Sequence, residues 1–159
     1  MAIDSRTLRN ALGCYPTGVT IVTIAPPEGP PIGMTMNSFT SISLNPPLLL
    51  ISLDRKASAF AEYMAASHVV VNVLSAGQKD LSTRFATPGN RQMTDIAFET
   101  WDTGCPVLPD SISVFECTVH ERSDAGDHVN FLLHVDRMVC NAEGDPLVYF
   151  RGKYAAVHV

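Results

Sequence analysis

The sequence predicts a mainly β protein, built as an antiparallel barrel with a few short helices. Three observations support this prediction. β-Branched and aliphatic runs dominate the chain, consecutive runs are joined by short turns rich in Gly, Pro, Asn and Asp, and the helical stretches are short. A doubly wound parallel sheet would instead need strands that alternate regularly with long helices.

The first half of the chain reads as one helix followed by strands. Asp4 or Ser5 can cap a short helix that continues to about Ala11 and ends near Gly13. Apolar and β-branched runs then predict strands at residues 18–25, 32–36, 39–44 and 48–53, separated by Pro-, Gly- and Asn-containing turns. Because the last run is largely apolar, we expect it to be buried on both faces.

The second half is expected to contain two short helices and four strands. The helices are predicted at residues 58–66 and 78–86, with a strand at 68–74 between them. Residues 87–109 show no sustained period, and long excursions of this kind are often functional. The remaining strands are predicted at 113–122, 128–140 and 146–150, with a hairpin turn at 123–127. Residues 1–159 show no internal repeat and are predicted to form a single domain.

Composition and charge exclude several classes of protein. The net charge is −5 with only 11 Lys and Arg residues and no basic cluster, so nucleic-acid binding is not expected. No apolar run reaches the roughly 18–20 residues of a membrane span. The mean hydropathy of +0.12 is high for a soluble monomer, so we expect a second buried surface, most simply a homodimer interface. The absence of a secretory signal and the four separate cysteines predict a cytoplasmic protein with reduced thiols.

The familiar catalytic signatures are absent from the sequence. There is no G-x-G-x-x-G at a helix start, no P-loop and no G-x-S-x-G elbow. The five histidines never occur as H-x-x-x-H or H-E-x-x-H, so no metal site is expected. The candidate residues are instead polar groups placed where strands end.

Two candidate segments lie in the first half of the chain. Residues 35–41 combine hydroxyls and an amide with Phe39, and they fit either an ordinary strand–turn–strand or a wall that binds the polar edge of a flat heterocycle. Arg55 and Lys56 precede a predicted helix whose start contains Ser58. Free N–H groups beside positive charge suit a phosphate, although a capped helix with solvated charges is the alternative.

Three further segments lie toward the C-terminus. Gln78, Ser82 and Phe85 are spaced to share one side of the second helix, where Phe85 could equally be core. The turn at residues 126–128 ends in Asp127 and His128, which can orient a charged cosubstrate or simply be exposed. Residues 149–154 interleave aromatics with cations and fit either ring stacking or a solvated terminal strand.

Ordered motifs cover nearly the whole chain. They are YPTGVTIVT at 15–23, GMTMNSFTSIS at 33–43, PPLLLISL at 46–53, NVLS at 72–75, QKDLS at 78–82, FA at 85–86, GDH at 126–128 and PLVYFRGKY at 146–154. Together they resemble the flavin reductase family, and more narrowly the short-chain reductase components of two-component flavin-dependent monooxygenases. The resemblance implies an FMN-binding split barrel that is dimeric and holds flavin near the subunit interface.

The resemblance also implies a role for each matching residue. The isoalloxazine and ribityl chain would contact Met36, Asn37, Ser38 and Ser41. The site would continue toward the ribityl and phosphate groups through Ser52, Leu53, Asp54, Lys56 and Ser58. Asn72, Ser82, Phe85 and Tyr154 would complete the flavin pocket, and His128 would lie on the nicotinamide side. Many relatives have glycine five residues after that histidine, whereas this chain has Leu133, which adds bulk on the side of nicotinamide access.

The resulting hypothesis is an oxidoreductase that transfers hydride from NADH or NADPH to FMN or FAD and supplies reduced flavin to a separate oxygenase. Flavins carry out this chemistry themselves, so the protein has to position the two rings rather than provide a nucleophile. The alternatives are a flavin-binding carrier or sensor without turnover, and a β-barrel that binds another ligand. The second of these leaves the Arg55–Lys56 segment unexplained.

Overall fold

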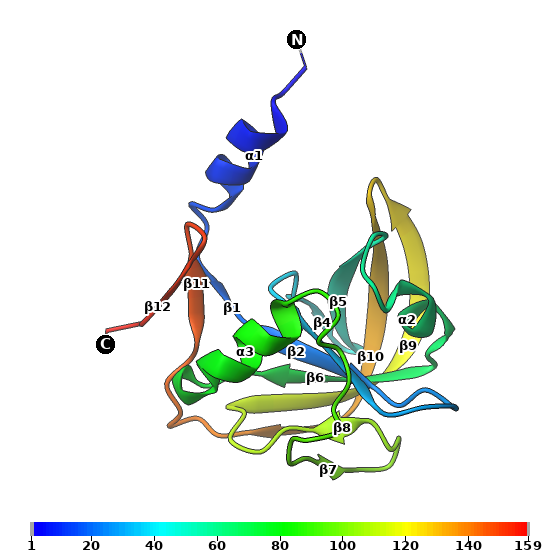
Figure 1. The fold of residues 1–159 in the computed structure, drawn as a ribbon. Coiled ribbons are helices and arrows are strands. Elements are labelled where there is room, and N and C mark those ends of the chain that lie inside the picture. Colours follow the sequence, from blue (N-terminus) through cyan, green and yellow to red (C-terminus); the bar gives the residue numbers. More distant parts are fainter. Residues whose placement is uncertain (1, 159) are drawn as a thin grey trace.

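A computed structural model describes residues 2–158, so Met1 and Val159 of the predicted domain lie outside the described residues (Figure 1). The main feature is a seven-stranded antiparallel sheet with the order β3-β2-β6-β9-β10-β5-β4. Its strands are β2 (Thr20–Ile24), β3 (Ile32–Met36), β4 (Thr40–Leu44), β5 (Pro47–Asp54), β6 (His68–Val73), β9 (Ser113–Ala125) and β10 (His128–Cys140). The mainly β, antiparallel prediction is therefore confirmed.

Two smaller sheets flank the main one. The C-terminal strands β11 (Val148–Phe150) and β12 (Lys153–Ala155) pair with β1 (Thr17–Gly18), and β7 (Glu99–Thr100) pairs with β8 (Pro106–Val107). The sequence prediction missed β7, β8 and β12, since each has only two or three residues and carries no sustained alternation. The first of these sheets brings residues from the two ends of the chain together.

The helices are short, as predicted. The helix α1 (Ser5–Leu12) is capped by Asp4, whose carboxylate accepts a hydrogen bond from the Thr7 N–H, and it ends at Gly13. A one-turn 3₁₀ helix, η1 (Ala76–Gln78), precedes α3 (Lys79–Ala86). No residue of α1 is buried, and Figure 1 shows this helix standing clear of the sheet. None of the helices in residues 2–158 has the length and apolar character needed to cross a bilayer.

The helix predicted at 58–66 is shorter in the structure, where α2 covers Phe60–Ala65. Turn hydrogen bonds from the Ala57 N–H to the Asp54 carbonyl and from the Phe60 N–H to the Ala57 carbonyl occupy the residues before it. Ser58 therefore lies in a turn and does not cap the helix. The residues predicted to form an anion site at a helix start therefore lie in the turn before the helix, and not at its first residues.

The main core links both ends of the curved sheet. Ile32 and Met36 of β3, Leu49 of β5 and Val71 of β6 belong to one buried cluster, together with Tyr63 of α2. Because β3 and β5 are far apart in the strand order, they can share one core only if the sheet curls over it. Hydrogen bonding still ends at the edge strands β3 and β4.

The strand β5 is not buried on both faces, contrary to the sequence prediction. Leu49, Ile51 and Leu53 are buried, whereas Leu48 and Leu50 are only half-buried. Strand side chains alternate between the two faces of a sheet, and no element among the described residues fully covers this outer face. The apolar run is consistent with an outer face that something else covers.

Candidate functional site

Two neighbouring cavities contain half of the predicted site residues. The first, of about 190 Å³, lies between the end of β3, α3 and the β11–β12 hairpin. The second, of about 210 Å³, lies between the loop before α2 and the loop that follows α3. Ala86 lines both cavities. Segments that are distant in the sequence therefore form one extended site.

The first cavity has neutral polar and aromatic walls. The Ser82 Oγ and the Tyr154 hydroxyl oxygen are 2.7 Å apart, so α3 is tied to β12. Tyr149 packs edge-on against Tyr154, with ring centroids 5.7 Å apart. The Thr35 hydroxyl donates to the Ser82 carbonyl at 2.7 Å. Of the wall predicted at residues 35–41, Thr35, Met36 and Asn37 line this cavity, whereas Ser38 and Ser41 do not.

The second cavity has cationic walls. Lys56 and Ser58 line one side, and the loop at residues 87–91 lines the other, with Phe85 beneath. Arg91 of this loop faces Ser58, to whose carbonyl its Nη1 donates at 2.6 Å. The same guanidinium lies 3.0 Å from a carboxylate oxygen of Glu62. Two cations thus flank a small cavity, an arrangement that suits an anion.

Sequence analysis missed Arg91 because the long segment in which it lies has no periodic pattern. A backbone hydrogen bond from the Gly33 N–H to the Arg91 carbonyl, 2.9 Å long, fixes this loop against β3. A Cβ atom added to Gly33 would lie 3.2 Å from both the Ile21 side chain and the Met93 sulfur, so this position is tightly packed. The only available sequence signal was an arginine in the Gly- and Asn-rich turn after the second helix.

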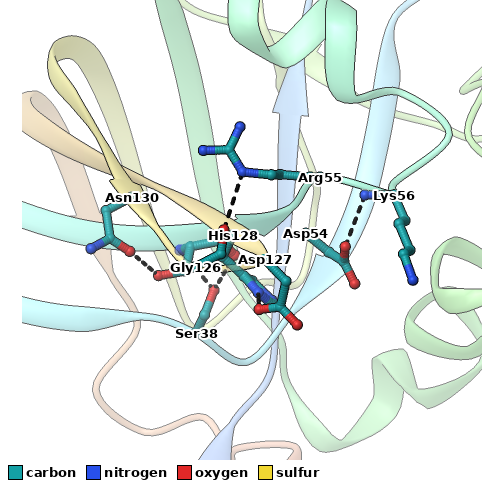
Figure 2. A network of polar contacts seen from close by, with 9 residues as sticks. Ser38, Asp54, Arg55, Lys56, Gly126, Asp127, His128 and Asn130 are labelled. Atoms are coloured by element: carbon teal, nitrogen blue, oxygen red, sulfur yellow. Dashed lines mark hydrogen bonds and ion pairs between the residues drawn. The ribbon is translucent and has the colours of Figure 1, made fainter.

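His128 opens strand β10 beside the loop that carries Lys56. It pairs in register with Asp54, and its Nδ1 lies 2.7 Å from a carboxylate oxygen of Asp127 (Figure 2). This contact lowers the pKa of the Asp127 carboxyl. The predicted orientation of the imidazole by Asp127 is confirmed, while the nicotinamide role of His128 stays a prediction.

Arg55 does not join the cationic cavity, although it was grouped with Lys56 in the predicted anion site. Its Nε donates to the Gly126 carbonyl at 3.3 Å, and its guanidinium forms an ion pair with Asp124. Its backbone N–H donates to the Asp127 carbonyl at 3.0 Å. Arg55 therefore fixes the β9–β10 turn against the end of β5 (Figure 2).

A short polar chain lies on the outer face of the sheet near His128. The Ser38 hydroxyl donates to the Ser52 carbonyl at 2.8 Å and accepts from the Ser52 N–H at 3.0 Å. The Ser52 hydroxyl in turn donates to the Asn130 amide oxygen at 2.5 Å. Figure 2 shows Ser38 and Asn130 on neighbouring segments of this group. Ser38 and Ser52 are thus brought together, and Asn130 is a neighbour that sequence analysis did not identify.

The remaining predicted residues are placed as follows. Ser41 is exposed on the edge strand β4. Asp54 accepts a hydrogen bond from the Lys56 N–H at 2.8 Å and so shapes the loop that carries this cation. Leu53 is 1% exposed, with its side chain in the core. Gln78, which was grouped with Ser82 and Phe85 on one side of the second predicted helix, is buried and accepts a hydrogen bond from the Ser75 N–H.

Asn72 lies in the interior and lines neither cavity. It is fully buried, its Nδ2 donates to the Ile21 carbonyl at 3.0 Å, and its Oδ1 accepts from the Leu108 N–H at 2.8 Å. Its amide therefore joins β6 to β2 and to the segment after β8. The structure places this predicted pocket residue away from the pocket because its polar groups already satisfy buried backbone groups.

Replacing Asn72 by Ala is expected to lower the free energy of unfolding by about 1–3 kcal/mol, because buried backbone groups lose their partners. Urea unfolding of the wild type and the variant measures this difference. Thr100→Ala, at an exposed strand position, is the control. Weakened flavin binding with unchanged stability would instead place Asn72 in contact with the ligand.

The comparison with known families agrees with this geometry. Residues 12–158 match the model of the flavin reductase like domain. The chain belongs to this family. Within residues 2–158, no three or more His, Cys, Asp or Glu side chains lie close enough together to hold a metal ion.

Two relatives of this flavin reductase-like chain are named as reductases. It is 45% identical over 151 residues to the FMN reductase (NADH) SmoA of Agrobacterium fabrum, covering 95% of this chain and 85% of that protein. It is 37% identical to the reductase component of the flavin-dependent trigonelline monooxygenase of Acinetobacter baylyi, covering 94% of this chain but 48% of that protein. The chain therefore spans about half the length of some relatives.

A solved structure provides the third comparison. The NADH:FAD oxidoreductase SgcE6 of Streptomyces globisporus, in complex with NAD and FAD fragments, superimposes on this flavin reductase-like chain with a TM-score of 0.91 at 31% identity. The match covers 99% of this chain and 97% of that one. The two proteins thus share their fold over almost their full lengths.

Proposed function

We propose that this chain is an NAD(P)H-dependent flavin reductase, which transfers hydride from a nicotinamide to FMN or FAD and supplies the reduced flavin to a separate oxygenase. The main supporting observation is the pair of adjoining cavities, one neutral and aromatic and the other cationic. The flavin reductases and the reductase component among its relatives support the same activity.

The lining of the two cavities fits the two chemical parts of a flavin nucleotide. Tyr154, Met36 and Asn37 offer apolar and aromatic surface with polar groups for the edge of a flat heterocycle. Lys56 and Arg91 offer positive charge for a phosphate. Ser52 of β5 and Ser38, which is hydrogen-bonded to it from the β3–β4 connection, would contact the polyol chain between these two parts.

A bound flavin supplies the hydride acceptor, and the protein's own residues bind and orient the reactants. Lys56, Ser58 and Arg91 hold the phosphate end in place. His128 holds the nicotinamide donor, and Asp127 fixes the orientation of its imidazole through Nδ1. Arg55 fixes the turn from which His128 extends. Positioning of this kind is sufficient for a direct transfer between two rings in contact.

We also infer that the curved sheet is a split barrel and that the chain is one domain. The core shared by β3 and β5 supports a barrel whose seam lies between β3 and β4. The β1–β11–β12 sheet, which joins the two ends of the chain, supports a single folding unit.

Purified protein is expected to oxidise NADH or NADPH only when FMN or FAD is added, which the loss of nicotinamide absorbance at a fixed protein concentration measures. Reduction of the flavin is measured in the same sample, under anaerobic conditions, as the loss of the flavin absorbance band. Flavin binding without nicotinamide oxidation would favour a carrier or sensor. Failure to bind flavin would contradict the proposed function.

The proposed enzyme is a homodimer that associates through the outer face of β4, β5 and β10. Leu44 is 97% exposed and Ile42 is 49% exposed on β4, beside the half-buried Leu48 and Leu50 of β5. Neighbouring apolar side chains of this kind on a surface are typical of an interface. The apolar side chains of α1, Leu8 and Leu12, are also exposed and would extend this contact.

Leu44→Asp is expected to convert the dimer to a monomer, because a charge would be buried without a partner in an apolar interface. Sedimentation velocity at micromolar protein concentration measures this change. The matched control is Thr100→Asp, an exposed position on β7 outside this face. A wild-type protein that sediments as a monomer with flavin bound would contradict the proposed dimer.

A further inference from the structure

One further cavity among the described residues takes no part in the proposed flavin site. It has a volume of about 650 Å³ and contains none of the residues predicted from sequence. Its walls come from the end of β2 and the turn after it, from α2, from the start of β6 and from the segment before β8. This cavity, hereafter the α2 cavity, has no function in the reaction as proposed.

The lining of the α2 cavity is apolar with negative charge at its rim. Side chains such as Ile24, Pro27 and Ala65 form most of its surface, whereas Glu28 and Glu62 carry carboxylates and no Lys or Arg lines it. Two opposite charges lie behind the wall: the buried Glu116 accepts hydrogen bonds from the N–H and the hydroxyl of Thr103, and Arg122 donates to the carbonyl of the wall residue Ala66. The two rim carboxylates favour an organic cation with an apolar body over a neutral or anionic ligand.

Glu62 connects the α2 cavity with the proposed phosphate site. It lines the α2 cavity, and its carboxylate oxygen lies 3.0 Å from the Arg91 guanidinium. Arg91 lines the cationic cavity that also contains Lys56. One carboxylate therefore pairs with a cation of the flavin site while it faces a second, separate cavity.

We propose that the α2 cavity binds a small organic cation with an apolar body, and that this binding strengthens the binding of the flavin phosphate. A cation beside Glu62 competes with Arg91 for the carboxylate and offsets its negative charge. Arg91 keeps its hydrogen bond to the Ser58 carbonyl at the cationic cavity, and its positive charge, no longer offset by Glu62, acts more strongly on the phosphate. The inference rests on the proposed function, because it assigns a regulatory site to the same flavin pocket.

The size of the effect follows from linkage. If the cation raises the affinity for FMN by some factor, FMN raises the affinity for the cation by the same factor, and such couplings are typically about 5- to 150-fold. Because the Glu62 side chain is about one-third exposed, we expect a value near the low end, about fivefold. Riboflavin has no phosphate, so its affinity should not change.

Benzyltrimethylammonium is a suitable probe, with benzyl alcohol and benzoate as neutral and anionic ligands of similar size. Calorimetric titration of the wild-type protein should show binding of the cation and much weaker binding of the other two. FMN and riboflavin are then titrated at saturating probe. The expected result is tighter FMN binding and unchanged riboflavin binding.

Two variants test whether the probe binds in the α2 cavity and whether Glu62 couples this cavity to the flavin phosphate site. Ala65→Phe, at an exposed position of the cavity wall, should fill the cavity and abolish probe binding while FMN still binds. Glu62→Gln should remove both the preference for a cation and the effect on FMN. Probe binding that persists in Ala65→Phe, or equal effects on FMN and riboflavin, would overturn the inference.

The same experiment separates failure of this inference from failure of the proposed function. FMN that binds and turns over without any probe effect leaves the reductase function intact and refutes the regulatory site. If FMN does not bind at all, the proposed function and the coupling both fail. In that case, probe binding that is lost in Ala65→Phe would still support the cation site itself.

Discussion

Lys56→Ala is expected to weaken FMN binding about ten- to a hundredfold and to leave riboflavin binding nearly unchanged. A hydrogen bond to a charged group contributes about 1.5–3 kcal/mol, which corresponds to a change of this size in affinity. Lys56 lines the cationic cavity opposite the loop that carries Arg91. Fluorescence titration of both flavins against wild type and variant measures the difference.

Arg55→Ala provides the matched control, because it removes the same charge from the adjacent position. Arg55 is engaged by Asp124 and the Gly126 carbonyl, so its loss should affect FMN and riboflavin alike and only weakly. Equal losses for the two flavins in Lys56→Ala would remove Lys56 from the phosphate site.

His128→Ala is expected to raise the apparent KM for NAD(P)H and to lower kcat by up to about a hundredfold, because a donor misplaced by about 1 Å reacts far more slowly. Some activity should remain, since the direct hydride transfer needs no proton from the imidazole. Flavin affinity should stay close to that of the wild type. Steady-state kinetics with varied NADH, together with FMN titration of the same preparation, test these expectations.

Asp127→Asn is a milder substitution that tests the same assignment, because it keeps His128 and changes only the residue that orients it. An amide can still form a hydrogen bond with Nδ1 of His128 but lacks the negative charge, so we expect a smaller rise in KM than in His128→Ala. A loss of flavin binding with normal NADH kinetics would place His128 on the flavin side of the pocket.

Local signals in the sequence were sufficient to locate most elements. The cap at Asp4 and the end at Gly13 bounded α1 to within one residue. The strand predicted at 32–36 coincides with β3, and the hairpin strand predicted at 128–140 coincides with β10. These features depend on hydrogen bonds and side-chain patterns within a few residues, and such patterns can be read from the chain itself.

Other features depend on contacts between distant segments. Lys56 and Arg55 are neighbours in the sequence, yet one lines the cationic cavity and the other holds the β9–β10 turn. Asn72 resembled a pocket residue, but the packing of β6 between β2 and β9 places its amide in the interior. Arg91 reaches Ser58 only because its loop is fixed against β3.

The sequence by itself determined the mainly β class, the order of its elements, the family and the set of polar residues from which a flavin site can be built. Only the tertiary structure decided which of these residues share a cavity, which face of β5 stays uncovered and that Glu62 lies between two cavities. The physical reason is that strand alternation fixes the two faces of a strand but not what covers each face. That depends on a strand order in which segments far apart in the chain become neighbours.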